Sequence, residues 1–134
     1  MEDNMTPYID GFVLPVPRDQ LKSYREVVEK VAEIWKEHGA LDYSEYVGDD
    51  SNLEGTRSFP DVANTKEDEV VIFGWVAFES REARDLANKR VAADPRMSDL
   101  INPLTNTSRP IFDAKRMVYG GFRSLVQSSN QNAV

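Results

Sequence analysis

The alternation of apolar and polar residues along the chain predicts four strands and two main helices. The strands are expected at Tyr8–Val16, Ala40–Val47, Glu69–Glu79 and Arg116–Val126. The helices are expected at Arg18–His38 and Arg81–Ala93. In the first helix, apolar residues recur at spacings of three and four, which is typical of an amphipathic helix. Gly39 follows it as a residue able to take positive φ, and Ser80 is a natural N-cap for the second helix.

The third predicted strand is the most apolar segment of the chain. Both of its faces are apolar, with Val70, Ile72, Val76 and Phe78 on one and Val71, Phe73, Trp75 and Ala77 on the other. Such a strand lies within a sheet that is covered on both sides. The element order β-α-β-β-α-β predicts an α+β, ferredoxin-like fold, in which a four-stranded antiparallel sheet carries two helices on one face. The other sheet face needs a cover, and a homodimer packed sheet face against sheet face is the simplest solution.

The segments between these elements are predicted to be irregular. Residues 48–68 lose the periodicity and gain Asp, Gly, Asn and Pro, so a functional or partly ordered loop is expected there. Asp94 and Pro95 are expected to begin a short extra turn, followed by a polar connection over 102–114. We divide the chain into an extension at 1–7, a single domain at 8–126 and a polar tail at 127–134, which is expected to be disordered.

Composition and charge narrow the class of protein. A chain of 134 residues fits one domain, and the absence of cysteine excludes disulfides, thiolate metal sites and thiol nucleophiles. The net charge of −7 argues against nucleic-acid binding, although residues 81–134 carry nine bases against five acids. We find no apolar run long enough for a membrane span and no signal-peptide pattern, so a cytoplasmic protein is expected.

The single histidine and a pair of adjacent aspartates are candidates for chemistry. Any imidazole acid–base or ligand role falls to His38, whose place before Gly39 at a helix end equally suits an interaction with the helix dipole. Asp49 and Asp50 are the candidate metal ligands, but a dedicated site needs more oxygen ligands, and turn chemistry is the alternative. We therefore expect no metal site.

Aromatic residues are the candidates for a ligand pocket, either between the sheet and the helices or between subunits. The pocket candidates are Trp35, Tyr43, Phe73, Trp75 and Arg116. Core packing is the alternative for the aromatic members. Asp10 on the first strand and Arg116 on the last are the polar groups expected to face a cavity, but a salt bridge or an exposed edge explains both equally well. Asp10, Tyr119 and His38 are the candidate catalytic residues.

Signatures of the common cofactor sites are missing from the sequence. We find no Gly-x-Ser-x-Gly elbow, no P-loop and no glycine-rich dinucleotide motif after a strand. Gly120 and Gly121 fall inside a predicted strand and cannot form a phosphate loop. No cofactor is therefore expected.

Seven short blocks of the sequence carry a resemblance to a known family. They are Tyr8–Pro17, Ile34–Tyr43, Val47–Asp50, Ser58–Pro60, Lys66–Val71, Ala93–Met97 and Lys115–Phe122. In this order they resemble the DUF1428 (YbaA-like) family of small bacterial proteins, over about Tyr8 to Val126. The resemblance implies the dimeric α/β-barrel form of the ferredoxin-like fold. It implies no particular activity, because one fold hosts many functions.

Three functions are compatible with these features. The first is a homodimeric protein that binds a small organic molecule in a pocket between elements or subunits. The second is a cofactor-independent enzyme, resembling an oxygenase or an isomerase, by analogy at the level of the fold. The third is an accessory factor for protein or RNA, which the basic C-terminal part permits and the overall charge disfavours.

Overall fold

The protein folds around one four-stranded antiparallel sheet. The computed structural model describes residues 6–128. The strands are β1 (Tyr8–Pro17), β2 (Asp42–Val47), β3 (Glu69–Phe78) and β4 (Val118–Arg123). Their order in the sheet is β2-β3-β1-β4, and every neighbouring pair is antiparallel. This confirms the predicted ferredoxin-like arrangement, in which the first strand lies beside the last.

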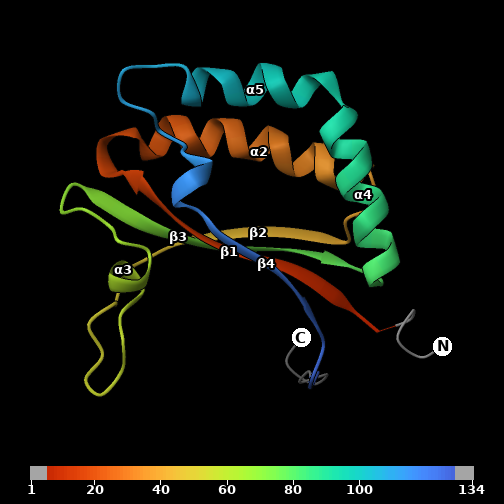
Figure 1. The fold of residues 1–134 in the computed structure, drawn as a ribbon, viewed down its shortest axis with the longest axis horizontal. Coiled ribbons are helices and arrows are strands. Elements are labelled where there is room, and N and C mark those ends of the chain that lie inside the picture. Colours follow the sequence, from red (N-terminus) through yellow and green to blue (C-terminus); the bar gives the residue numbers. More distant parts are fainter. Residues whose placement is uncertain (1–5, 129–134) are drawn as a thin grey trace, which may run out of the picture.

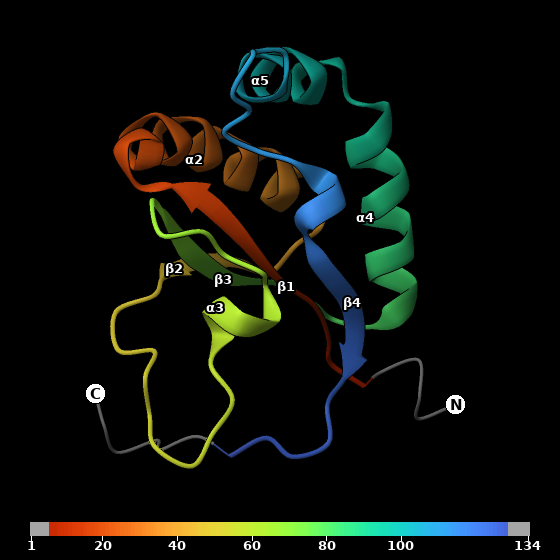
Figure 2. The same ribbon diagram turned by 60° about the vertical axis from the view of Figure 1, so that its left-hand side comes forward.

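Three helices lie on one side of the sheet. They are α2 (Leu21–Glu37), α4 (Arg81–Ala93) and α5 (Pro95–Thr105). Helix α2 packs along the sheet, α5 lies over α2 on the side away from the strands, and α4 stands at one end (Figure 1). Turning the molecule shows α4 beside β4 (Figure 2). Short 3₁₀ turns, η1 (Arg18–Gln20) and η2 (Ala114–Arg116), precede α2 and β4.

The helix ends follow the local signals of the sequence. Gly39 takes a φ of +114° directly after the C-cap residue of α2, a conformation that glycine adopts without strain. The Ser80 hydroxyl accepts a hydrogen bond from the Ala83 amide at 3.1 Å and caps α4. Both predicted boundaries are confirmed.

Helix α5 is longer than predicted. The sequence indicated a short turn followed by a polar connection from residue 102, but the helix continues to Thr105. The Asp94 carboxylate caps it by accepting from the Arg96 amide at 3.0 Å, and Pro95 occupies the first turn, where its missing amide is not needed. Pro103 lies within the segment predicted as a connection, but the structure places it near the end of the helix, and the next residue, Leu104, is buried in the core.

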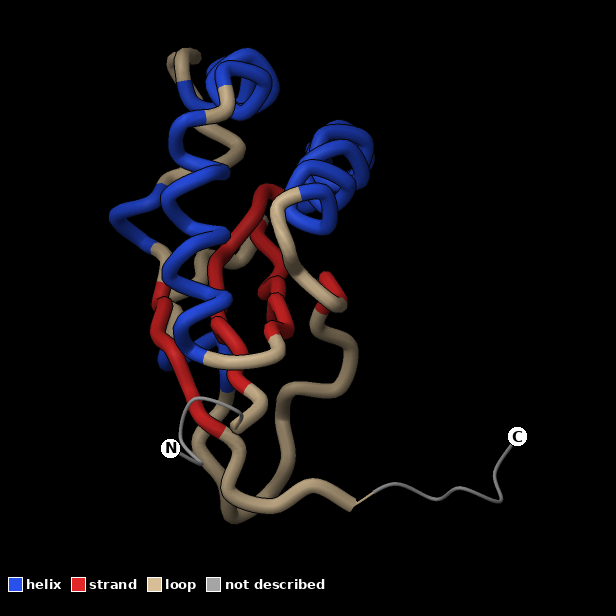
Figure 3. Tube along the Cα trace, turned by 90° about the vertical axis from the view of Figure 1, so that its right-hand side faces the viewer, coloured by secondary structure: helices blue, strands red, loops and turns tan. Residues whose placement is uncertain are grey.

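Strand β4 and the 48–68 segment also differ from the predicted outline. Arg116, where the strand was predicted to begin, belongs to η2, and the strand runs from Val118 to Arg123, so Met117 and residues 124–126 lie outside it. The 48–68 segment contains a single helical turn, α3 (Phe59–Val62), capped by Ser58. The helices gather on one side of the strands, and this loop extends on the other (Figures 2 and 3). Of the predicted tail, residues 127 and 128 are exposed, and 129–134 lie outside the described residues.

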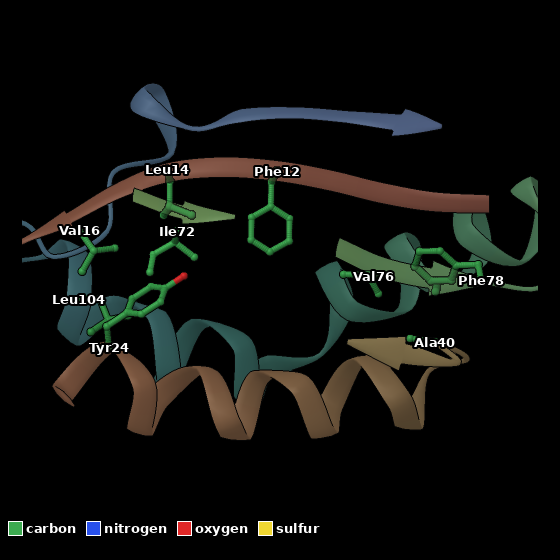
Figure 4. Close-up of a cluster of buried hydrophobic side chains, with 10 residues drawn as sticks. Phe12, Leu14, Val16, Tyr24, Ala40, Ile72, Val76, Phe78 and Leu104 are labelled. Carbon is green, nitrogen blue, oxygen red and sulfur yellow. The ribbon is translucent and has the colours of Figure 1, made fainter. Parts of the chain in front are cut away.

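The core fills the space between the sheet and the helices. Along β1 and β3, every second residue points inward, beginning with Tyr8 and Val70. The inward residues meet Tyr24 of α2 and Leu104 of α5 (Figure 4). The buried core comprises Phe12, Leu14, Val16, Tyr24, Ala40, Ile72, Val76, Phe78, Ala87 and Leu104.

Candidate functional site

One row of inward-facing residues crosses all four strands. Glu45 of β2 pairs with Gly74 of β3, Gly74 with Phe12 of β1, and Phe12 with Tyr119 of β4. The Phe12 ring lies over Gly74, since a Cβ there would come within 2.6 Å of the ring. It also stacks on the Tyr119 ring, at 6.2 Å between centroids. The missing side chain of Gly74 therefore makes room for Phe12 between two polar groups.

Two hollows adjoin this row. A cavity of about 140 Å³ lies between the sheet, α2, α5 and the segment before β4. A groove of about 410 Å³ follows α2 along the free edge of β2. Four residues line both hollows: Tyr24, Val28, Tyr43 and Glu45. These residues form a shared wall, which combines apolar surface with a few hydrogen-bonding groups, as small-molecule sites do.

Glu45 is the polar centre of the shared wall. The Tyr24 hydroxyl donates to its Oε1 at 2.5 Å, and the Tyr43 hydroxyl donates to its Oε2 at 2.6 Å. Burial raises the pKa of the Glu45 carboxyl more than the two phenol hydrogen bonds lower it. Burial, together with the nearby carboxylate, also raises the pKa of both tyrosines, so they remain protonated donors.

A second polar cluster lies at the β4 end of the row. Asp10 is fully buried and accepts from the Tyr119 hydroxyl at 2.7 Å and from Arg84 Nη1 at 3.2 Å. Arg84 Nη2 donates to the Tyr8 hydroxyl at 3.0 Å. Burial raises the pKa of the Asp10 carboxyl, against the lowering effects of Tyr119 and Arg84. Tyr119 also lines the cavity, so this cluster reaches the same interior space.

The predicted pocket residues divide between the two faces of the sheet. Trp35 and Tyr43 line the cavity, together with Tyr119, one of the candidate catalytic residues. Phe73 and Trp75 lie on the outer face, because the two-residue repeat of β3 turns them away from Ile72 and Val76. There Tyr46 stacks on Trp75 with ring centroids 5.4 Å apart, and Phe59 of α3 meets Phe73 at 5.6 Å. Within the described residues, Phe73 and Trp75 therefore lie on the opposite side of the sheet from the cavity that Trp35 and Tyr43 line.

Arg116 does not face the cavity. Its guanidinium pairs with both carboxylate oxygens of Glu69, at 2.6 and 2.7 Å, and donates to the Asn64 carbonyl at 3.1 Å. Asp10 and Arg116 each form a salt bridge with another residue, Asp10 with Arg84 and Arg116 with Glu69. The salt-bridge alternative therefore describes both residues.

His38 and the paired aspartates lie away from the cavity. His38 Nε2 is 2.9 Å from Asp94 Oδ2, which joins the end of α2 to the cap of α5. Arg96 extends this cluster to Glu37, and its hydrogen bond is the main cause of the lowered pKa of Asp94. Asp49 and Asp50 are exposed. Within residues 6–128, no three histidine, aspartate or glutamate side chains gather as a metal site would require.

Three residues of these polar clusters were not predicted from the sequence: Glu45, Tyr24 and Arg84. Glu45 lies two residues after Tyr43 and therefore on the same face of β2, a pattern that could have placed it beside the pocket. Tyr24 belongs to the apolar stripe of α2, where its hydroxyl carries no sequence signal. Arg84 resembles any surface arginine of a charged helix, and only the packing of α4 against β1 brings it to Asp10.

Solved structures share this fold at low sequence identity. A NIPSNAP family protein with unknown function from Agrobacterium tumefaciens aligns with a TM-score of 0.54 and 17% identity, covering 90% of this chain and 89% of that one. The monooxygenase from the gene ActVA-Orf6 of Streptomyces coelicolor, in complex with the ligand Nanaomycin D, aligns with a TM-score of 0.54 and 16% identity, covering 97% of both chains. These likenesses support the ferredoxin-like fold alone. Among the described helices, none has the length and apolarity to cross a bilayer.

Sequence relatives are much closer. The uncharacterized protein YbaA of Escherichia coli is 40% identical over 119 residues, which cover 89% of this chain and 97% of YbaA. The YbaA protein of Shigella flexneri matches to the same extent. The family described as "Protein of unknown function (DUF1428)" matches residues 7–111. The chain therefore belongs to the DUF1428 family.

Proposed function

We propose that the protein binds a small organic molecule at the shared wall of the cavity and the groove. The observation that carries this proposal is the convergence of two hollows on Tyr24, Tyr43 and Glu45. The cavity of about 140 Å³ suits a single ring, and the groove of about 410 Å³ has room for a larger group. One fold neighbour was solved with an organic ligand, but its 16% identity adds no information about this site.

The proposal is tested by native mass spectrometry of the freshly purified protein. Ala32 lines the groove, so Ala32→Trp fills it, whereas Ala92→Trp places the same bulk on the exposed face of α4. We expect a reproducible extra mass on the wild type and on Ala92→Trp, and its loss from Ala32→Trp. A wild type without extra mass, or an Ala32→Trp variant that retains it, contradicts the proposal.

We further propose that a second copy of the chain covers the outer face of the sheet. Exposed apolar side chains gather there on all four strands and on α3: Ile9, Tyr46, Phe59, Phe73, Val118 and Phe122. An apolar surface of this kind is typical of an interface. A two-fold axis through the face would set each patch against its own copy.

The charges at the two ends of the outer face favour a second copy over another partner. The 48–68 loop, which follows Val47 and precedes Glu69, carries six acids and two bases: Asp49, Asp50, Glu54, Asp61, Glu67 and Asp68 against Arg57 and Lys66. Arg123 pairs with Tyr8 at the opposite end of the sheet. Antiparallel stacking of two copies would bring the acidic loop of each toward Arg123 of the other and keep the two acidic loops apart.

Sedimentation velocity tests the homodimer. Phe73 and Leu86 are exposed to similar extents, 43% and 48%, on the outer face and on α4. We expect a dimer for the wild type and for Leu86→Glu, and a folded monomer for Phe73→Glu, because the introduced carboxylate would be buried without a partner. A wild-type monomer, or a dimeric Phe73→Glu variant, contradicts this arrangement.

A cofactor-independent enzyme is the second candidate function. It is favoured by the Tyr119 hydroxyl, which lines the cavity and donates to the buried Asp10 carboxylate. This pair could exchange a proton with a bound molecule. The test is deuterium uptake by the copurified molecule in D₂O: the enzyme requires uptake with the wild type and its loss with Tyr119→Phe while binding persists. Equal uptake with both proteins contradicts the role of Tyr119.

A further inference from the structure

Glu45 differs from the other buried or partly buried carboxylates among the described residues, because it has no basic partner. Asp10 is paired with Arg84, and Glu69 with Arg116. Among the described residues, no lysine, arginine or histidine nitrogen lies within 4.0 Å of the Glu45 carboxylate. Its hydrogen bonds come from two neutral phenols. Its negative charge is therefore hydrogen-bonded but not neutralised.

The two phenols leave part of the carboxylate free to bind. Each tyrosine donates to a different oxygen, so each oxygen retains a further acceptor site. A carboxylate withdrawn from water is favoured by an opposite charge close by. Since Glu45 lines both hollows, a molecule entering either of them can reach it.

The remaining lining favours a positively charged group. Tyr24 and Tyr43 line both hollows, and aromatic faces attract organic cations. Glu29 adds a second carboxylate to the groove. The one basic lining residue, Arg25, is paired with Glu29 at 3.7 Å, with 79% of its side chain exposed. An anionic ligand would meet uncompensated negative charge at the shared wall.

We propose that the ligand is an organic cation, an amine with an apolar body, whose ammonium group pairs with Glu45 while its apolar part occupies the cavity. This inference rests on the proposed function and adds the chemical class of the ligand. The cavity supplies the apolar surface through Phe12, Trp35 and Ile101, among others. The cation would neutralise the Glu45 charge and donate to its remaining acceptor sites.

The test compares two probes of the same shape, phenethylamine and 2-phenylethanol. Trp35 lines the cavity and Trp75 lies on the other sheet face, so in a Trp75→Phe background the fluorescence of Trp35 reports occupancy. We expect the amine to bind about tenfold tighter than the alcohol or better, from one charge-assisted hydrogen bond. Glu45→Gln should weaken amine binding to about the level of the alcohol and so remove this preference. Glu33→Gln, an exposed position on the same helix as Tyr24, should retain it.

The outcomes separate this inference from the function on which it rests. Equal binding of amine and alcohol to the wild type overturns the cation assignment and leaves the small-molecule site standing. A preference that survives Glu45→Gln also overturns the assignment, because another group must then carry it. If neither probe at millimolar concentration alters Trp35 fluorescence or releases heat in calorimetry, the proposed binding function and the cation assignment are both contradicted. Circular dichroism of each variant confirms that it is folded.

Discussion

Gly74→Ala is the substitution whose effect follows most directly from the packing of the site. A Cβ at this position would lie 2.6 Å from Phe12 Cζ and 2.7 Å from the Ser44 carbonyl oxygen, whereas ordinary contact begins at 3.4 Å. The Phe12 ring is held in the core, and the carbonyl belongs to the backbone of β2. Neither neighbour can move without disturbing the sheet or the cavity.

The expected loss of stability combines two opposing effects. Overpacking costs about 1–3 kcal/mol, and two immobile neighbours place this case near the upper value. Replacing glycine regains about 0.5–1 kcal/mol of backbone entropy. The net destabilisation is about 2 kcal/mol, which lowers the Tm of a chain this size by roughly 6–10 °C.

Urea unfolding followed by circular dichroism measures this change, with Gly48→Ala as the matched control. At Gly48 a Cβ would meet its nearest neighbour, the Val71 carbonyl oxygen, at 3.4 Å, so the control should stay within about 0.5 kcal/mol of the wild type. Adding Phe12→Leu should make Gly74→Ala less costly than it is alone, because the closest ring atoms are removed. If Gly74→Ala is as stable as Gly48→Ala, the reasoning about Phe12 is refuted.

Three further predictions concern the ion pairs. Hydrogen bonding to Arg116 is the main cause that lowers the pKa of Glu69 to about 2, so the pair contributes stability above the unfolded pKa near 4.5 that is lost as pH falls toward 2. Glu69→Gln should therefore lower the free energy of unfolding by about 1–2 kcal/mol at pH 7, as measured by urea unfolding. A difference from the wild type that is no smaller at pH 3 would contradict this. Arg84→Met should lose about 3 kcal/mol at pH 7 by leaving Asp10 buried and unpaired. Because burial raises the pKa of Asp10, lowering the pH should protonate the carboxyl and reduce the stability difference between Arg84→Met and the wild type. A difference that grows as the pH falls would contradict this reasoning. His38→Ala should lower the Tm without changing phenethylamine affinity, since its partner is Asp94, and a loss of affinity at unchanged Tm would restore a role in the site.

The fold could be predicted because its signals are local and periodic. The spacing of apolar residues in α2, the Ser80 cap and the doubly apolar β3 each act over a few residues. Together they determine the order of elements, and the short connections allow few other topologies. The length of α5 was underestimated because a proline such as Pro103 favours the end of a helix, whereas the burial of Leu104 depends on tertiary contacts.

The candidate site could be predicted only in part. Trp35, Tyr43 and Tyr119 line the cavity, because aromatic residues on a helix stripe or an inward strand face meet in the interior. Phe73 and Trp75 were grouped with them because both faces of β3 are apolar, so the pattern does not reveal which face meets the helices. The hydrogen bond from Tyr24 to Glu45 depends on the approach of α2 to β2, which has no local signal.

The central claim is that a small organic molecule occupies the interior beside Glu45, and methyl NMR tests it most directly. Met97, Met117 and Ile101 line the cavity, and Ile9 lies exposed on the outer face of the sheet. In a protein labelled at the methionine and isoleucine methyl groups, titration with phenethylamine should shift the resonances of the three cavity residues and leave Ile9 unchanged. Shifts of Ile9 with no change at the cavity residues would contradict the account.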